Sequence, residues 1–94
     1  MKHPAQRTDY GRVRTPAEVG ALARKERSNR GLTLADLYET TGLSTRFVSE
    51  FERGKEHASL GRALRLLESL GLDVIIVPRH EAERLLRGRA IDSP

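Results

Sequence analysis

Apolar residues recur at helical spacing in four stretches between residues 15 and 71, and residues that start or stop helices bound each stretch. The first stretch begins at Thr15, which can cap a helix. Pro16 suits the first helical position, and Glu18 would complete a capping box with Thr15. Gly31 then marks the end of the helix near Arg30. The pattern predicts a first helix from about residue 16 to residue 30.

Two shorter helices follow. Thr33, with Asp36 three residues later, opens the second helix, which Gly42 ends. Ser44 is a good N-cap for the third helix, which ends at Gly54. The apolar residues expected to face the core are Leu37 and Tyr38 in the second helix, and Val48 and Phe51 in the third.

Ser59 caps a fourth predicted helix. Gly71 is well placed as the left-handed residue after its end, with Leu72 folding back on Leu67. The stripe expected to face the core consists of Leu60, Ala63, Leu64, Leu67 and Leu70.

The spacing of the apolar residues changes after this helix. The segment from Val74 to Val77 is β-branched throughout and is stopped by Pro78, so it predicts a strand. A lone strand leaves its backbone groups unpaired, and pairing with the same strand of a second chain is the economical solution. The alternative is an extended tail buried on its own domain. The expected dimerisation residues are Leu72, Val74, Ile75, Ile76 and Val77.

The second and third helices, joined through Gly42 and Leu43, match a helix-turn-helix. In such a unit the second helix enters the major groove, and the N-terminus of the first lies against the phosphate backbone. Thr33 and Ser44 both begin helices, so their hydroxyls and the free N–H groups behind them can bind phosphate.

The outward face of the later helix supplies candidates for reading bases, because Val48 and Phe51 fix its buried face. Arg46 can donate two hydrogen bonds to guanine. Glu50 can accept one from cytosine or can bond a neighbour such as Arg46, and the sequence leaves both open. The outward residues are Thr45, Arg46, Ser49 and Glu50, with Arg53 and Lys55 following where phosphates would lie.

Three segments carry a family signature: residues 31–33 (Gly-Leu-Thr), 42–44 (Gly-Leu-Ser) and 48–55 (Val-Ser-Glu-Phe-Glu-Arg-Gly-Lys). They resemble the Xre/Cro-type helix-turn-helix family of phage repressors, and residues 64–79 resemble its HipB-like branch. The resemblance covers about residues 15–79. It implies a mainly α, lambda-repressor-like domain of four to five helices, with one C-terminal strand pairing across a homodimer. It also implies a DNA-binding repressor, often the antitoxin of a HipA-type kinase toxin.

Within that resemblance, Arg27 and Glu52 fall where some members bury an ion pair between the first and third helices. We expect their role to be structural, because removing one partner of a buried pair is costly. Leu34, Thr45 and Phe47 depart from the family pattern, which commonly has Gln, then Gln or Arg, then Ser or Thr. Phe47 would pack or touch a thymine methyl, and its burial preference favours packing.

The composition narrows the function classes. The chain has 94 residues and no cysteine, which excludes disulfides and thiolate zinc sites and leaves oligomerisation as the expected stabiliser. Its net charge is +4, with most of the excess in residues 1–14, and nucleic acid is the leading anionic partner. His3, His57 and His80 share no metal-ligand spacing, so neither metal nor cofactor is expected.

No Gly-rich phosphate loop, nucleophile elbow or paired carboxylates are present in the sequence, and no enzyme is expected. No apolar run approaches the roughly 20 residues that span a bilayer, so we expect a soluble, cytoplasmic protein without a membrane partner. The expected organisation is a flexible basic arm (1–14), a helix-turn-helix domain (15–71), a dimerisation strand (72–79) and a C-terminal tail (80–94) that could contain a short helix.

The sequence therefore predicts a homodimeric repressor on an inverted-repeat operator, the antitoxin and autoregulator of a HipA-like toxin system. The rival prediction is a protein-interaction module that mainly neutralises a toxin, with DNA binding secondary. Leu34 and Thr45 support the rival, because they remove usual DNA contacts.

Overall fold

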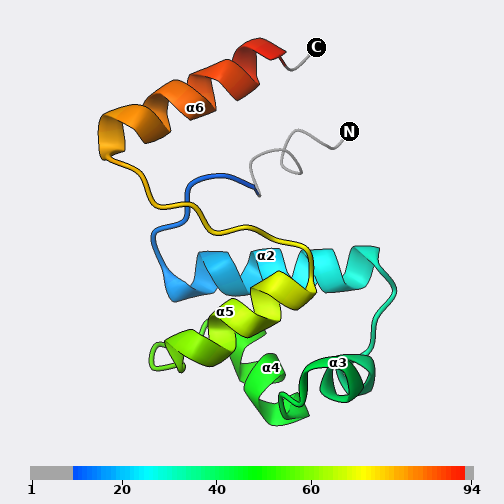
Figure 1. Cartoon of the computed structure of the whole chain (residues 1–94). Helices are drawn as coiled ribbons and strands as arrows, with labels where there is room; N and C mark the ends of the chain where they lie inside the picture. The colour runs from blue at the N-terminus through cyan, green and yellow to red at the C-terminus, as the bar shows by residue number, and fades with distance from the viewer. Residues whose placement is uncertain (1–9, 93–94) are drawn as a thin grey trace. The chain divides into compact units, whose positions relative to one another are not determined.

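The computed structural model describes residues 10–92, and side chains as far as residue 87. Within residues 10–92 the chain forms five helices: α2 (Pro16–Asn29), α3 (Leu34–Thr41), α4 (Thr45–Glu52), α5 (Leu60–Ser69) and α6 (Arg79–Asp92) (Figure 1). The chain divides into two compact units. One, Val13–Val74, holds α2 to α5, and α6 belongs to the other. The start of the predicted arm, residues 1–9, lies outside the described residues.

The starts of α2 and α3 follow the predicted capping boxes. The Thr15 hydroxyl accepts a hydrogen bond from the Glu18 N–H at 3.1 Å, and the Glu18 carboxylate accepts one from the Thr15 N–H at 3.2 Å. The corresponding distances between Thr33 and Asp36 are 3.0 and 2.8 Å. Each box satisfies two of the donors that a helix N-terminus leaves without an intrahelical partner. Both predicted boxes are confirmed.

The end of α5 also has the predicted geometry. Gly71 has a φ of 75°, the left-handed conformation that glycine adopts without steric cost. The Gly71 N–H donates to the Glu68 carbonyl and the Leu72 N–H to the Leu67 carbonyl, both at 2.9 Å. These two bonds form a Schellman motif, which folds Leu72 back toward the core as predicted.

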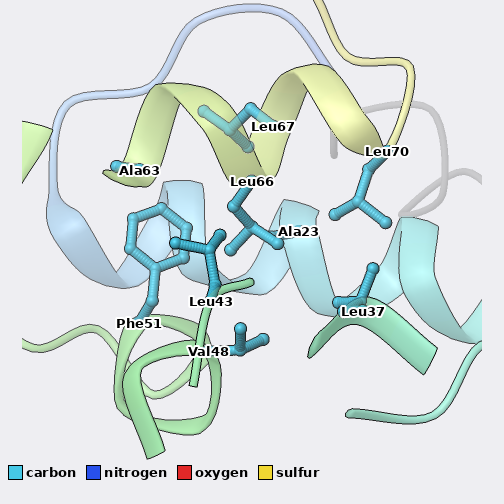
Figure 2. Packing of buried hydrophobic residues seen from close by; sticks show 9 residues of the cluster. All are labelled: Ala23, Leu37, Leu43, Val48, Phe51, Ala63, Leu66, Leu67 and Leu70. Atoms are coloured by element: carbon cyan, nitrogen blue, oxygen red, sulfur yellow. The ribbon is translucent and has the colours of Figure 1, made fainter. Parts of the chain in front are cut away.

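The core of this unit joins residues from all four of its helices. In Figure 2 the Leu66 and Leu70 side chains of α5 point toward the side chains from α2, α3, α4 and the turn between the last two. No polar or charged residue among the described ones is buried. The buried hydrophobic residues are Ala23, Leu37, Leu43, Val48, Phe51, Ala63, Leu66, Leu67 and Leu70.

Three residues predicted to face the core are exposed instead: Tyr38, Leu60 and Leu64. Successive residues on a helix are about 100° apart, so Tyr38 and Leu64 point well away from the buried Leu37 and Ala63 that precede them. Leu60 stands in the first turn of α5, ahead of the buried row. Leu66 is absent from the predicted stripe, but it is fully buried, as Leu70 is, and Ala63 is also buried. The buried face of α5 is therefore rotated from the predicted one.

A close contact between backbones fixes α4 against α2. A Cβ atom added at Gly20 would overlap the carbonyl oxygen of Phe51 and lie 2.9 Å from that of Glu52. Such distances leave no room for a side chain, and the neighbouring atoms are backbone that cannot swing aside. Glycine at position 20 thus allows α2 to pack directly on the C-terminal turn of α4.

Residues 72–78 have no regular secondary structure, and no strand occurs among residues 10–92. Val74, Ile75 and Ile76 are 55%, 71% and 93% exposed. The predicted strand needs a second chain, and it stays a prediction. In the predicted tail the structure has a helix of 14 residues, α6. None of the described helices is long and apolar enough to cross a membrane.

Candidate nucleic-acid interface

The turn between α3 and α4 is held by local hydrogen bonds and one buried side chain. Gly42 closes α3 with a φ of 77°, and its N–H donates to the Tyr38 carbonyl at 2.8 Å. Leu43 is buried in the angle between the two helices. The Thr41 hydroxyl donates to the Leu37 carbonyl at 2.7 Å and accepts from the Leu43 N–H at 3.0 Å. These contacts fix the direction in which α4 leaves α3.

The inner face of α4 is apolar and aromatic. Val48 and Phe51 are buried in the core. Phe47 is half-buried and stacks on Phe51, with ring centroids 6.0 Å apart and planes 20° apart. Of the two roles considered for Phe47, the structure has the one in which its ring packs against its own chain. The inner face thereby sets which side of α4 is turned outward.

The outer face of α4 carries the residues predicted to read DNA. Thr45 and Arg46 are exposed, and Ser49 and Glu50 are partly so. The Ser44 hydroxyl accepts from the Phe47 N–H at 3.0 Å and caps the helix. The N–H groups of Thr45 and Arg46, which precede Phe47 in the first turn, have no intrahelical acceptor, so they are available to an anion.

Hydrogen bonds link the predicted contact residues to one another. The Glu50 carboxylate accepts from Arg46 Nε at 3.1 Å and from Lys55 Nζ at 3.0 Å. Arg53 Nη1 donates to the Ser49 hydroxyl at 2.6 Å. Of the two roles left open for Glu50, the free chain adopts the bond to its neighbours. Lys55 first, and Arg46 second, hold the pKa of Glu50 below its ordinary value.

Arg27 and Glu52 form a bidentate ion pair on the opposite side of α4. Arg27 Nε lies 2.6 Å from Glu52 Oε2, and Nη2 lies 3.0 Å from Oε1. The third guanidinium nitrogen, Nη1, donates to the Leu32 carbonyl at 2.8 Å. The hydrogen bond with Glu52 raises the pKa of Arg27 above its ordinary value. The pair ties the end of α2 to the end of α4.

A shallow hollow of about 220 Å³ lies between α4 and the start of α5. Phe47 and Phe51 line it together with four basic side chains and one acidic one, Glu50, and two helix-capping serines, Ser44 and Ser59, border it. The chemistry of this rim suits a phosphate group. The basic residues are Arg46, Lys55, His57 and Arg62.

Sequence reasoning identified only part of this rim. Arg62 and His57 were not among the predicted DNA contacts, and Ser59 was noted only as a helix cap. Arg62 could have been found from its position in the first turn of α5, three residues after that cap. Its N–H donates to the Ser59 hydroxyl at 3.2 Å.

Other predicted residues lie apart from this outer face. Thr33 caps α3 and is exposed, and no hydrogen bond connects it to α4 among the described residues. Leu34 packs against the core. Leu72 is partly buried against the core, and Val77 is partly buried. The residues between them are exposed, and this segment has no regular secondary structure. No cluster of three potential metal ligands occurs in the described part of the chain.

Several known proteins resemble this chain in sequence or in fold. A family model described as helix-turn-helix matches residues 23–76. The HTH-type transcriptional regulator y4mF of Sinorhizobium fredii is 34% identical over 73 residues, covering 78% of this chain and 96% of the relative. The solved HipB-O4 20mer complex has a chain that superposes with a TM-score of 0.68 at 20% identity, covering 73% of this chain and 97% of HipB. The HipA-HipB-O2-O3 complex gives a TM-score of 0.67 at 20% identity, with coverage of 73% and 97%.

Proposed function

The chain belongs to the helix-turn-helix family, and from that premise we propose that it is a cytoplasmic, sequence-specific DNA-binding repressor. It acts as a homodimer on an inverted-repeat operator and represses by occupying a promoter. The observation that carries the proposal is the outer face of α4, an exposed polar row backed by a buried apolar face. A helix of this kind can enter the major groove without unfolding the core.

The residues divide into two groups of contacts. Thr45, Arg46 and Ser49 lie on the outer face of α4, where base edges would be met. Phosphate contacts come from the helix starts and from the basic residues that follow α4, because these lie beyond the groove-facing turn. The proposed phosphate-binding residues are Thr33, Ser44 and Arg53, with Ser59 and Arg62 added from the hollow. Lys55, which the sequence predicts as a further phosphate contact, is bonded to Glu50 in the free chain.

We propose that the exposed segment around Ile75 and Ile76 forms the dimer by pairing with the same segment of a second chain. The exposure of Val74, Ile75 and Ile76 supports this, since three adjacent β-branched side chains in water are costly. Ile76→Asp should give a monomer in light scattering. A variant that remains a dimer at micromolar concentration would show that the chain associates elsewhere.

We propose that the second partner is a HipA-like kinase toxin, so that the protein is an antitoxin and autoregulator. Support comes from the fold shared with HipB, which has been solved together with HipA. The competing function is an interaction module for which DNA binding is secondary. One observation favours it: an anionic side chain, Glu50, stands on the face that would meet anionic DNA.

Selection from random duplex DNA with the purified chain, followed by salt titration of the winner, tests the proposal. An enriched inverted repeat, with half-sites about one helical turn apart and a steep loss of affinity with salt, is expected. Weak, sequence-blind binding would favour the interaction module. Repeating the titration with Ile76→Asp separates the contribution of the dimer from that of each half-site.

A further inference from the structure

The Glu50 carboxylate bonds two cations at once on the outer face of α4, one from its own helix and one from the loop that follows. Oε2 accepts from Arg46 Nε at 3.1 Å, and Oε1 accepts from Lys55 Nζ at 3.0 Å. The Glu50 carbonyl also accepts from the Lys55 N–H at 3.1 Å, within the turn that ends the helix. Lys55 is thus tied to Glu50 through both backbone and side chain.

The bond to Arg46 leaves the reading edge of the guanidinium unoccupied. Only Nε of Arg46 is used, and in the described part of the chain its two Nη atoms make no hydrogen bond. The Arg46 side chain is 87% exposed, whereas Glu50 is 25% exposed. The better-packed carboxylate therefore holds a long, otherwise free side chain in one orientation. Guanine is read by two parallel N–H donors, and the free Nη atoms provide them.

The same carboxylate lowers the positive charge of the face. Arg46, Lys55 and Glu50 together carry one net positive charge, whereas the two cations without Glu50 would carry two. Each extra cation available to phosphate strengthens binding to every duplex equally, irrespective of sequence. Neutralising one cation locally reduces that sequence-independent attraction.

From these contacts we infer that Glu50 is a specificity-determining positioning residue, which aims Arg46 at a base and restrains Lys55 from sequence-independent phosphate binding. The inference rests on the proposed function and extends it. It assigns Glu50 a role through its two neighbours, in place of a direct contact with cytosine. With Glu50 bonded to Arg46 and Lys55, the protein binds DNA in general less tightly but discriminates better between sequences.

The test compares Glu50→Gln with the wild type on the selected operator and on a scrambled duplex, each across a range of salt. Glutamine keeps the size of the side chain and removes its charge. The scrambled duplex should be bound about three- to tenfold more tightly, with the salt slope steeper by about 0.9 for one additional phosphate contact. The ratio of the two affinities should fall by at least about fivefold.

Two double variants identify the route of the effect. Glu50→Gln with Lys55→Met should return the salt slope to that of the wild type. Glu50→Gln with Arg46→Ala should discriminate no worse than Arg46→Ala alone, because Glu50 acts through Arg46. Glu68→Gln is the matched control, since it makes the same charge change at an exposed position on α5. It should alter neither the salt slope nor the ratio of the affinities for the two duplexes.

The outcomes separate this inference from the proposed function. A wild type without preference between the duplexes overturns both. A wild type with preference, and a Glu50→Gln variant with unchanged ratio and slope, overturns the inference alone. A further loss of discrimination in the double variant with Arg46→Ala, confined to one C·G pair, would make Glu50 a direct base reader and also overturn it.

Discussion

The two faces of α4 each carry an arginine–glutamate pair, and the pairs differ in their surroundings. On the inner side, Arg27 and Glu52 have side chains that are 16% and 8% exposed and share two short hydrogen bonds. On the outer side, Arg46 and Glu50 are 87% and 25% exposed and share one. A shielded pair whose polar atoms are all bonded is costly to break, whereas a solvated pair exchanges its partner for water at little cost.

The comparison indicates a division of labour along one short helix. The inner pair belongs to the structure, because it joins residues of two different helices that are 25 positions apart in the chain. The outer pair joins residues one turn apart and contributes little to the fold. Variants on the two faces should therefore affect different measurements.

The largest expected effect is on the inner pair. Glu52→Ala should destabilise the chain by about 3 kcal/mol, because it leaves the Arg27 guanidinium shielded from water without its anion. Urea denaturation followed by circular dichroism measures it. Glu50→Ala is the matched control and should leave the midpoint of urea unfolding close to that of the wild type, because its pair is solvated. Equal losses in the two variants would remove the distinction between the faces.

The next effect concerns the backbone contact behind α4. Gly20→Ala should cost about 1–3 kcal/mol, because the new Cβ would overlap the Phe51 carbonyl. In an unobstructed helix the same change is stabilising by up to about 1 kcal/mol. Gly61→Ala supplies that control, since the nearest atom to its added Cβ is 4.0 Å away. The two midpoints of urea unfolding should shift in opposite directions, and a stabilised Gly20→Ala would contradict the close approach.

On the outer face the effect should appear in binding. Arg46→Ala should cost about 1–3 kcal/mol on the operator and relax the preference at one base pair, because it removes a bidentate donor. Its melting temperature should stay within about 2 °C of the wild type. Fluorescence anisotropy on operators changed one base pair at a time measures it. An equal loss on every sequence would make Arg46 a phosphate contact.

The smallest expected effect is the pH dependence of the outer pair. The pKa of Glu50 is lowered in the folded chain, so its contribution to stability is complete above its unfolded pKa of about 4.5. It is lost as the pH falls through the folded value. The wild type should lose slightly more stability than Glu50→Gln between about pH 4.5 and pH 3. Urea midpoints across this range check the difference, and parallel curves would show that the pair adds nothing.

Much of the fold was predictable because the signals are local. A capping box such as that of Thr33 and Asp36 lies within four residues, and so does a glycine that ends a helix. Such signals place the limits of α2 to α5 without knowledge of the rest of the chain. The outward face of α4 was also predictable, since burying Val48 and Phe51 fixes the opposite side.

Other features required the packed structure. The rotation of α5, which buries Leu66 and exposes Leu60 and Leu64, depends on the neighbours that the helix meets. Periodicity alone admits either face in a helix with so many leucines. The hollow between α4 and α5, with Arg62 at its rim, likewise arises from two segments that meet only in the folded chain.

The sequence by itself determined where α2 to α5 begin and end and which residues α4 turns outward, because backbone capping and amphipathic spacing act over one or two turns. Only the tertiary structure decided which face of α5 is buried and which of its side chains border the hollow beside α4, because both depend on contacts between segments that meet only in the folded chain.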